Sequence, residues 1–473
     1  MKKYFSRLNF GYERTLLYML QQTEYNVREY FAWLRRVKDF REVRRRGDMV
    51  STLKVKLLFL GLAVFVLVYL GVIFAILVIF STQIWLYAVA FFLILLLPVL
   101  AQYAIILPLI LGDILVKKPL AKHRIELAKK YLQNHKGYKI AIAGSYGKTT
   151  AKSVLATILA GGKKVAATPG NINQPLGFAK FIAGLTGDED TLIFEFGESR
   201  PGDIMEMCEF IRPDAGFITG INDAHLATFK TRENLVADIM DLQKFLCKKP
   251  IYLNGDCKML RKYDDKNSVL YSQDGLENLP VKNVKVTAFG TQFDLGTFAG
   301  IESGLLGRHN IGIVAASVDF AKKLGLNEKE IHAGLKNLKP FEHRMEPRIL
   351  GGATIIDDTY NGNLDGFRAG IELLRELPAQ RKIYITPGLV EQGSATEKNH
   401  REIAKLLADA KFDKLVLMKN SVTKIIREEL LSRKYRGEIL LVDDPLNFYQ
   451  NLASFVASGD VVLMQNDWTD NYA

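Results

Sequence analysis

Between Leu57 and Gly112 the chain contains no charged residue. A single helix over this stretch would be about 84 Å long at 1.5 Å per residue, whereas the apolar part of a bilayer is about 30 Å thick. Two helices fit better, one over residues 57–80 and a second beginning near Ile84, with a polar break at 81–83 between them. The pattern therefore predicts a two-helix transmembrane hairpin.

Basic residues flank this hairpin on both sides. Those before it are Arg44, Arg45, Arg46, Lys54 and Lys56, and those after it are Lys117, Lys118, Lys122 and Arg124. Because positively charged flanks stay in the cytoplasm, we expect both termini there, in a multi-pass protein of the cell membrane. Trp85 and Tyr87 suit the level of the lipid headgroups. A buried hairpin inside a soluble core is the alternative, which so long an uncharged stretch disfavours.

Residues 11–46 mix aromatic residues with arginines at roughly helical spacing. They predict either an amphipathic helix on the cytoplasmic face of the membrane or a solvated helix that packs on the catalytic part. Most of the formal net charge of +12 lies in residues 1–56, which contain 14 Lys or Arg and 6 Asp or Glu. A basic segment beside apolar spans indicates contact with membrane lipids and argues against nucleic acid as a partner.

From about residue 138 onward, strand-like runs alternate with helix-like segments, which predicts an α/β domain with a largely parallel sheet. The first run opens the stretch YKIAIAGSYGKTTAK, residues 138–152. It is close to the phosphate-binding pattern G-x-x-x-x-G-K-[ST], although Ile142 stands where the first glycine belongs. In such a loop Lys148 reaches the β- and γ-phosphates and Thr149 places its hydroxyl on Mg²⁺. An ordinary strand–turn–helix is the alternative.

Six further motifs follow in order. They are TPGNINQPLG (168–177), FEFGESRPGDI (194–204), INDAHLATF (221–229), LNGD (253–256), GRHNIGIVAAS (307–317) and DDTYNGN (357–363). With these motifs the sequence from about 138 to the end resembles the Mur ligase family, the ATP-dependent amide ligases of peptidoglycan assembly. GRHN and DDTYNGN are most similar to the members that add D-alanyl-D-alanine. The family's loop is a shortened G-S/T-x-G-K-T-T, in which Gly144 makes the turn.

The resemblance implies a two-step reaction. ATP phosphorylates a substrate carboxylate to an acyl phosphate, and an amine then displaces phosphate to give an amide, ADP and phosphate. It implies ATP and Mg²⁺ as cofactors, a muramyl peptide as the acceptor, either UDP-linked or lipid-linked, and D-Ala-D-Ala as the amine. Such chemistry requires that the phosphate be positioned, its charge neutralised and water excluded.

The resemblance also assigns the site residues. The catalytic residues are Lys148, His225 and Arg344. The nucleotide-binding residues are Gly144, Ser145, Gly147, Lys148, Thr149, Thr150, Asn310, Asp358 and Asn361, with Asp357 as an alternative to Asp358. The metal-binding residues are Thr149, Glu195 and His225, with Glu198 as an alternative to Glu195. The substrate-binding residues are Asn171, Asn173, Glu391 and His400.

The sequence departs from the family at three points. Ile239 stands where the family has a carbamylated lysine, so Asp238 or Asp241 could supply a carboxylate instead. The stretch 386–393 keeps a glutamate and a glycine of the family's Gly-Asp-Met-x-Glu-Leu-Gly pattern but lacks its aspartate, which affects the expected amine contacts. Only about 30 residues separate the hairpin from the phosphate loop, so the hairpin stands where the family has a domain that binds the UDP-sugar.

We therefore expect a membrane-anchored peptide ligase of cell-wall precursor synthesis. Its predicted parts are a basic helical segment (1–52), the hairpin (53–115), a central ATP-binding P-loop domain (116–340) and a C-terminal Rossmann-like domain (341–473). Other wall-synthesis membrane proteins are further candidate partners. Two alternatives remain, namely an enzyme similar to poly-γ-glutamate synthases, and a non-catalytic nucleotide-binding scaffold at the membrane.

Overall fold

The structure, a computed structural model, describes residues 2–9, 11–23, 25–43, 49–222, 226–360, 362–389 and 395–466. The chain forms two compact units, Met1–Arg124 and Ile125–Ala473, and each is described here by itself. The long helix α7 (Lys118–Asn134) runs across the boundary between them.

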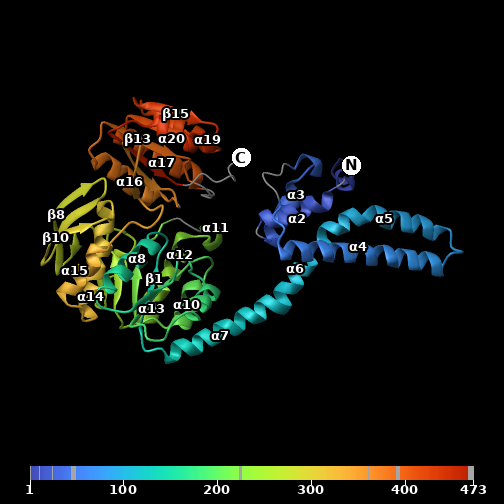
Figure 1. The fold of residues 1–473 in the computed structure, drawn as a ribbon, viewed down its shortest axis with the longest axis horizontal. Coiled ribbons are helices and arrows are strands. Elements are labelled where there is room, and N and C mark those ends of the chain that lie inside the picture. The colour runs from blue at the N-terminus through green and yellow to red at the C-terminus, as the bar shows by residue number, and fades with distance from the viewer. Residues whose placement is uncertain are drawn as a thin grey trace. The chain divides into compact units, whose positions relative to one another are not determined.

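The first unit contains the two apolar helices expected from the uncharged stretch. Helix α4 (Leu53–Ile79) and helix α5 (Trp85–Ala104) pack side by side (Figure 1), and the Tyr69 hydroxyl donates to the carbonyl of Leu93 at 3.0 Å. After α5 the chain continues through α6 (Leu107–Gly112) and a π-helical turn (Asp113–Lys117) into α7. By length and composition, α4 and the continuous helical stretch Trp85–Asn134 could each cross a membrane.

The N-terminal segment forms short helices rather than one long helix. These are α1 (Lys2–Phe5), the 3₁₀ turn Ser6–Leu8, α2 (Tyr12–Gln22), α3 (Val27–Arg36) and the 3₁₀ turn Phe40–Glu42. Their apolar side chains form one buried cluster with Leu58 and Leu62 of α4 and with Ile105 and Ile106 after α5. The segment therefore covers one end of the hairpin.

The second unit begins with a parallel six-stranded sheet in the order β2-β3-β1-β4-β5-β6. Its strands are β1 (Tyr138–Ala143), β2 (Val165–Ala167), β3 (Thr191–Glu195), β4 (Ala215–Ile218), β5 (Ile251–Asn254) and β6 (Ser268–Tyr271). All five strand pairings in this sheet are parallel, so their carboxyl ends share one edge. The phosphate loop and the segment after β3 both leave from that edge.

Helices cover both faces of this sheet. They are α8 (Lys148–Leu159), α9 (Pro175–Ile182), α10 (Asp203–Ile211), α11 (Leu226–Phe229), α12 (Arg232–Ile239), α13 (Asp241–Leu246), α14 (Ile311–Lys323) and α15 (Glu328–Lys336), with a 3₁₀ turn at Arg261–Tyr263. One apolar cluster joins the sheet to α8, α14 and α15, and a second joins it to α7, α9, α10, α12 and α13. This is the layered α/β arrangement that the alternating pattern predicts, and that prediction is confirmed.

A small antiparallel sheet that the sequence reading did not anticipate follows β6. Its strands are β7 (Gly275–Leu276), β8 (Leu279–Thr287), β9 (Gly290–Leu295) and β10 (Phe298–Ser303). It lies beside α15 (Figure 1), and Phe293, Leu295 and Phe298 are buried in the same cluster as that helix. A 3₁₀ turn, Arg308–Asn310, then leads into α14.

The C-terminal part is a second six-stranded sheet, in the order β11-β12-β16-β13-β14-β15. Its strands are β11 (Glu346–Leu350), β12 (Ala353–Asp358), β13 (Arg381–Thr386), β14 (Lys414–Met418), β15 (Glu438–Val442) and β16 (Asp460–Gln465). Its helices are α16 (Leu364–Glu376), α17 (Thr396–Ala410), α18 (Thr423–Ser432), α19 (Pro445–Gln450) and α20 (Leu452–Phe455). Only the edge strand β11 pairs antiparallel, as expected for a Rossmann-like sheet with one added edge strand.

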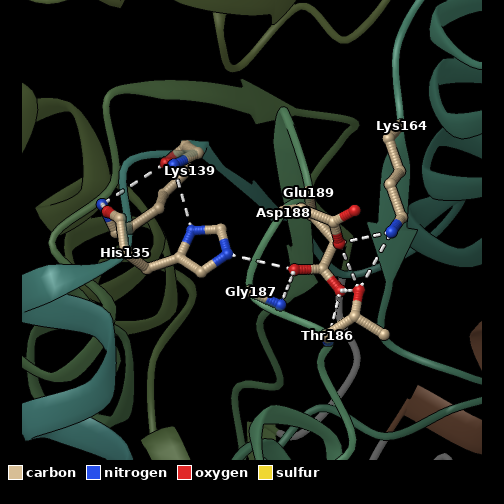
Figure 2. Close-up of polar contacts among 8 residues, drawn as sticks. His135, Lys139, Lys164, Thr186, Gly187, Asp188 and Glu189 are labelled. Atoms are coloured by element: carbon tan, nitrogen blue, oxygen red, sulfur yellow. Dashed lines mark hydrogen bonds and ion pairs between the residues drawn. The ribbon is translucent and has the colours of Figure 1, made fainter.

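A buried polar contact fixes the end of α7 to the first sheet (Figure 2). His135 Nε2 lies 3.1 Å from Glu189 Oε2, and the Gly137 amide donates to His135 Nδ1 at 3.0 Å. The amide occupies the lone pair of Nδ1, so Nε2 carries the proton that is donated to Glu189. The Thr186 and Gly187 amides also donate to this carboxylate, at 2.7 and 2.9 Å. Burial alone would raise the pKa of Glu189, but these hydrogen bonds hold it well below its usual value.

Candidate active site

The phosphate loop connects β1 to α8 and depends on two glycines. Gly144 has a φ of +131° and Gly147 a φ of +74°, and side chains are strained in both conformations. A Cβ at Gly144 would also lie 2.5 Å from Thr219 Oγ1 and 2.9 Å from the Gly220 carbonyl oxygen. Ile142, at the place of the missing glycine, is a fully buried residue of β1. The turn thus starts at Gly144, and no glycine is required two residues earlier.

The loop also holds a polar atom with no partner. Ser145 Oγ is buried and makes no hydrogen bond within the described residues, although the Ser145 amide donates to the Gly220 carbonyl at 2.7 Å. A buried hydroxyl without a partner costs free energy unless a ligand or water satisfies it. At the amino end of α8, where backbone N–H groups favour an anion, this atom suits a phosphate oxygen.

Four buried charges gather beside the loop, and we call them the charge quartet: Lys148, Lys152, Glu195 and Glu198. Lys148 Nζ lies 2.8 Å from Glu198 Oε2 and also donates to the Gly144 carbonyl. Lys152 Nζ lies 2.8 Å from Glu195 Oε2, without hydrogen-bond geometry. No side chain of the quartet is more than 13% exposed. Both lysines come from α8, whereas Glu195 is the last residue of β3 and Glu198 lies three residues beyond it, in the segment that follows the strand.

Thr149 lies within this cluster. Its hydroxyl donates to Glu195 Oε1 at 3.3 Å, and both residues are buried. A hydroxyl and a carboxylate next to a phosphate loop are the oxygen ligands that suit Mg²⁺, which takes its other ligands from phosphates and water. The residues present therefore fit the ion implied for this site. Among the described residues, no group of three or more His, Cys, Asp or Glu could hold a metal by itself.

The loop predicted to hold substrate, residues 168–174, is tied to the same edge of the sheet. Lys152 Nζ donates to the Gly170 carbonyl at 2.6 Å, and the Glu195 amide donates to Thr168 Oγ1 at 3.2 Å. The Asn173 carbonyl accepts from the Gly197 amide at 2.9 Å. Asn171 is exposed at the tip of this loop. These contacts bring Asn173 close to the charge quartet.

A cavity of about 240 Å³ is lined by four of the nine predicted nucleotide residues, Gly147, Thr150, Asn310 and Asp358. From the central part of the chain it is lined by Tyr146, Gly147, Thr150, Thr219 and Asn310, among others. From the C-terminal part it is lined by Arg344, Asp358 and Asn363, among others. The phosphate loop and the start of the C-terminal domain thus face one space.

Two charged residues of this cavity, Asp358 and Arg344, are strongly desolvated. Burial raises the pKa of Asp358 to about 6, and the Gln465 amide donates to its Oδ2 at 2.7 Å. Burial also lowers the pKa of Arg344, whose guanidinium lies 4.4 Å from the centre of the Tyr360 ring. Arg344 Nε is buried with no hydrogen-bond partner within the described residues. Both groups would gain from a polar ligand.

The structure separates the two adjacent aspartates that the sequence left open. Asp357 accepts from His343 at 3.0 Å and from the Thr359 hydroxyl at 2.7 Å, and it does not line the cavity. Asp358 lines the cavity. Its geometry favours Asp358 as the nucleotide contact. Asn310 also lines the cavity, with its side-chain amide donating to the Leu306 carbonyl at 2.7 Å.

Other predicted residues are placed elsewhere or lie outside the described residues. His225, Asn361 and Glu391 belong to the latter group. His400 is fully buried, with Nε2 accepting from the Leu389 amide at 2.9 Å and Nδ1 on the Thr396 carbonyl at 2.6 Å. Both of its ring nitrogens are therefore engaged within the protein, and its substrate role stays a prediction.

The two aspartates near the missing lysine have other partners. Asp238 accepts from the Gly202 amide at the start of α10, and burial raises its pKa to about 6. Asp241 lies 2.7 Å from Lys244. The described residues therefore give neither carboxylate a contact with Glu195 or Thr149.

Lys152 was not singled out from the sequence, although it contacts both Glu195 and the carbonyl of Gly170. A second lysine one helical turn after Lys148 was the available signal, since residues four apart share a helix face. Tyr146 was missed as well. Its ring packs against Gly220, where a Cβ would lie 2.3 Å from a ring carbon, and it lines the cavity.

Two family models match the part of the chain that carries this site. The model of the Mur ligase middle domain matches residues 142–318, and the model of the Mur ligase glutamate ligase domain matches residues 343–465. Together they cover more than half of the chain. The chain belongs to the Mur ligase family. It is an ATP-dependent, ADP-forming peptide ligase.

Named relatives agree with this placement. A UDP-N-acetylmuramoyl-tripeptide–D-alanyl-D-alanine ligase of Borreliella burgdorferi is 30% identical over 328 residues, covering 67% of this chain and 68% of the relative. The enzyme of that name from Bacillus subtilis is 25% identical over 347 residues, covering 72% and 75%. Among solved structures, MurF ligase from Thermotoga maritima in complex with ADP aligns with a TM-score of 0.64 and 28% identity, covering 73% of this chain and 80% of that one.

Proposed function

We propose that this Mur ligase adds D-Ala-D-Ala to the carboxylate of a muramyl peptide, with ATP as the phosphoryl donor and Mg²⁺ as the metal. The observation that carries the proposal is the cavity in which the phosphate loop, Asn310, Arg344 and Asp358 face one space. The relatives named for this reaction, which match across both ligase domains, support the choice of dipeptide and acceptor.

In this proposal different residues of the site bind the phosphates, the metal and the acceptor. Lys148 and the loop amides bind the β- and γ-phosphates and offset the negative charge that spreads over the transferred group. Thr149 and Glu195 would hold Mg²⁺, which neutralises phosphate charge when it is bound. The loop carrying Asn171 and Asn173 positions the acceptor carboxylate beside the quartet.

Arg344 and Asp358 would act from the C-terminal domain. Asp358 accepts from a ribose hydroxyl, and the Arg344 guanidinium pairs with phosphate, which gives its unpartnered Nε a ligand. Both residues belong to the C-terminal domain, residues 341–473. Closing that domain on the nucleotide therefore assembles the site and excludes water. His225, Asn361 and Glu391 remain candidates for the metal, nucleotide and amine contacts.

We further propose that α4 and α5 anchor the enzyme in the cell membrane, with both termini in the cytoplasm. The support is an uncharged stretch whose large side chains are exposed, among them Leu67 (71%), Phe74 (69%) and Phe92 (69%). We propose domain boundaries at 52, 115 and 340. An anchored enzyme meets a lipid-linked acceptor at a raised effective concentration, which favours a lipid-linked muramyl peptide as the acceptor. The UDP-linked muramyl peptide is the alternative.

A substrate panel tests this function. The full chain in liposomes is given ATP, Mg²⁺ and D-Ala-D-Ala with UDP-linked or lipid-linked muramyl tripeptide, and ADP release is measured. We expect ADP release that requires both acceptor and dipeptide, and kcat/KM for the two acceptors identifies the physiological form. If single amino acids or glutamate replace the dipeptide at equal kcat/KM, the assignment to D-Ala-D-Ala addition is wrong.

A further inference from the structure

The ion pair between Lys148 and Glu198 lies at the amino end of α8, beside the proposed phosphate site. Lys148 Nζ lies 2.8 Å and 3.1 Å from the two carboxylate oxygens of Glu198, so the contact engages both. The Glu198 side chain is 1% exposed, and the Lys148 side chain is 13% exposed. The lysine proposed to bind phosphate is therefore paired with a buried carboxylate.

The second pair of the quartet has a different environment. Lys152 is fixed by Glu195 and by the Gly170 carbonyl, and its side chain is 6% exposed. Neither Lys152 nor Lys148 lines the nucleotide cavity itself. Lys148, however, directly follows Gly147, which does line that cavity, and stands at the first position of α8. Of the two pairs, only Lys148–Glu198 is placed to exchange its carboxylate for a phosphate.

An ammonium in a buried site cannot serve two anions equally well. A buried charge without its partner is costly, which explains why Lys148 keeps a counter-ion while no phosphate is present. A phosphate that enters must replace that counter-ion, and the negative charge of Glu198 then stays beside it. Part of the binding free energy of the nucleotide is thereby lost.

We propose that Glu198 is a positioning residue that holds the Lys148 ammonium and competes with the nucleotide phosphate for it. It keeps the phosphate-binding lysine in place, at the expense of nucleotide affinity. The inference rests on the nucleotide site of the proposed function. It does not depend on which acceptor or amine the enzyme uses.

The test is the affinity for ADP, measured by titration calorimetry on the full chain in detergent without Mg²⁺. ADP avoids turnover, and the absence of Mg²⁺ removes any effect of Glu198 on a metal. We expect Glu198→Gln to lower the Kd for ADP at least threefold. Glu198→Asp keeps the charge but withdraws the carboxylate from Lys148, and we expect it to lower the Kd as well, by a smaller factor.

Glu206→Gln is the matched control. It removes one negative charge from the same segment, but Glu206 is exposed and pairs with Arg200 at 2.9 Å, so the Kd for ADP should stay within 1.5-fold of the parent value, about 0.2 kcal/mol. Thermal unfolding of each variant shows whether it is folded. A merely structural ion pair would weaken ADP binding when broken, whereas the proposal requires a gain.

The outcomes separate the inference from the proposed function. An unchanged or raised Kd in folded Glu198→Gln overturns the inference. A gain in Glu198→Gln with none in Glu198→Asp also overturns it, because charge repulsion without the contact would then explain the result. Failure of the parent enzyme to bind ADP would instead contradict the nucleotide site itself.

Discussion

Lys148 is the residue on which we expect phosphate binding in this site to depend most. It is the first residue of α8, and its ammonium lies among the charge quartet. We expect Lys148→Ala to reduce kcat/KM for ATP at least a hundredfold, since an uncompensated phosphate charge in a closed site costs about 3 kcal/mol of transition-state stabilisation. Steady-state ADP release measures the effect.

The matched control for that substitution is Lys164→Ala. Lys164 is half exposed and pairs with Asp188, away from the cavity lining. We expect ADP release by this variant to equal that of the parent. Parent-like ADP release by folded Lys148→Ala would show that the loop does not bind the transferred phosphate.

Asp358 gives a pH-dependent prediction at the same scale. Its pKa is raised from an ordinary 3.8 to about 6, chiefly by burial, with Asp357 raising it further and Arg344 and Gln465 opposing the rise. A raised carboxyl pKa stabilises the fold below pH 4, and this contribution is lost as pH rises through 6. Asp358→Asn, which can still accept from Gln465, should therefore be more stable than the parent at pH 8 by about 1–2 kcal/mol.

The measurement is thermal unfolding of both proteins from pH 4 to pH 8. The difference in Tm should grow with pH over this range and level off above pH 6.5. A constant difference, or one that is largest at pH 4, would contradict the desolvation of this carboxylate. The same variant should bind ATP more weakly, because it cannot offer a charged acceptor to the ribose.

At the scale of elements, His135 and Glu189 secure the end of α7 to the first sheet (Figure 2). Glu189→Gln removes a charged acceptor of four hydrogen bonds and should cost about 2 kcal/mol at pH 7. The pKa of Glu189 is depressed, so its carboxylate stabilises the parent protein above the ordinary value of 4.5, and this contribution is lost as the pH falls below that value. The stability difference between the parent and Glu189→Gln should therefore shrink in acid.

Hydrogen exchange reports this contact directly. The Gly137 amide, which donates to His135, should exchange faster in Glu189→Gln than in the parent at pH 7. Glu126→Gln, which removes an exposed carboxylate of α7 paired with Lys129, should leave that rate unchanged. Equal exchange in all three proteins would mean that the contact does not hold α7.

Elements with strong local signals could be predicted from the sequence. The uncharged run predicted apolar helices at 57–80 and from Ile84, close to the observed α4 and α5. The N-terminal segment was harder, because Gly11 and the turn near Asn26 divide it into short helices. The sheet β7–β10 was missed because its strands alternate weakly. Two left-handed glycines also shape it, Gly296 in the turn before β10 and Gly300 at the register shift within β10, and only the fold shows their role.

The site was predictable where a motif implied it and not where long-range contacts decide it. Lys148, Thr149 and Asp358 come from motifs, and the structure places all three at the loop or the cavity. The pairing of Lys148 with Glu198 joins residues 50 apart in the chain and needs β3 beside β1. The choice between Asp357 and Asp358 likewise depends on which of them faces the cavity.

For the whole molecule, the proposed anchor is testable independently of the chemistry. If α4 and α5 span the membrane, the full chain should stay in the pellet after alkaline carbonate extraction. Leu67→Arg together with Phe74→Arg should reduce the fraction of the protein that stays in the pellet, since a charge at the centre of a span costs about 3 kcal/mol per residue. Leu67→Ala with Phe74→Ala is the matched control and should stay in the pellet.

The central claim is that this chain joins a dipeptide amine to a muramyl-peptide carboxylate through an acyl phosphate. The most direct measurement uses an acceptor with an ¹⁸O-labelled terminal carboxylate, incubated with the full chain, ATP, Mg²⁺ and D-Ala-D-Ala. We predict equal amounts of ADP and extended peptide, with one ¹⁸O atom transferred to each phosphate released. Release of unlabelled phosphate, or of ADP without extended peptide, would contradict the account.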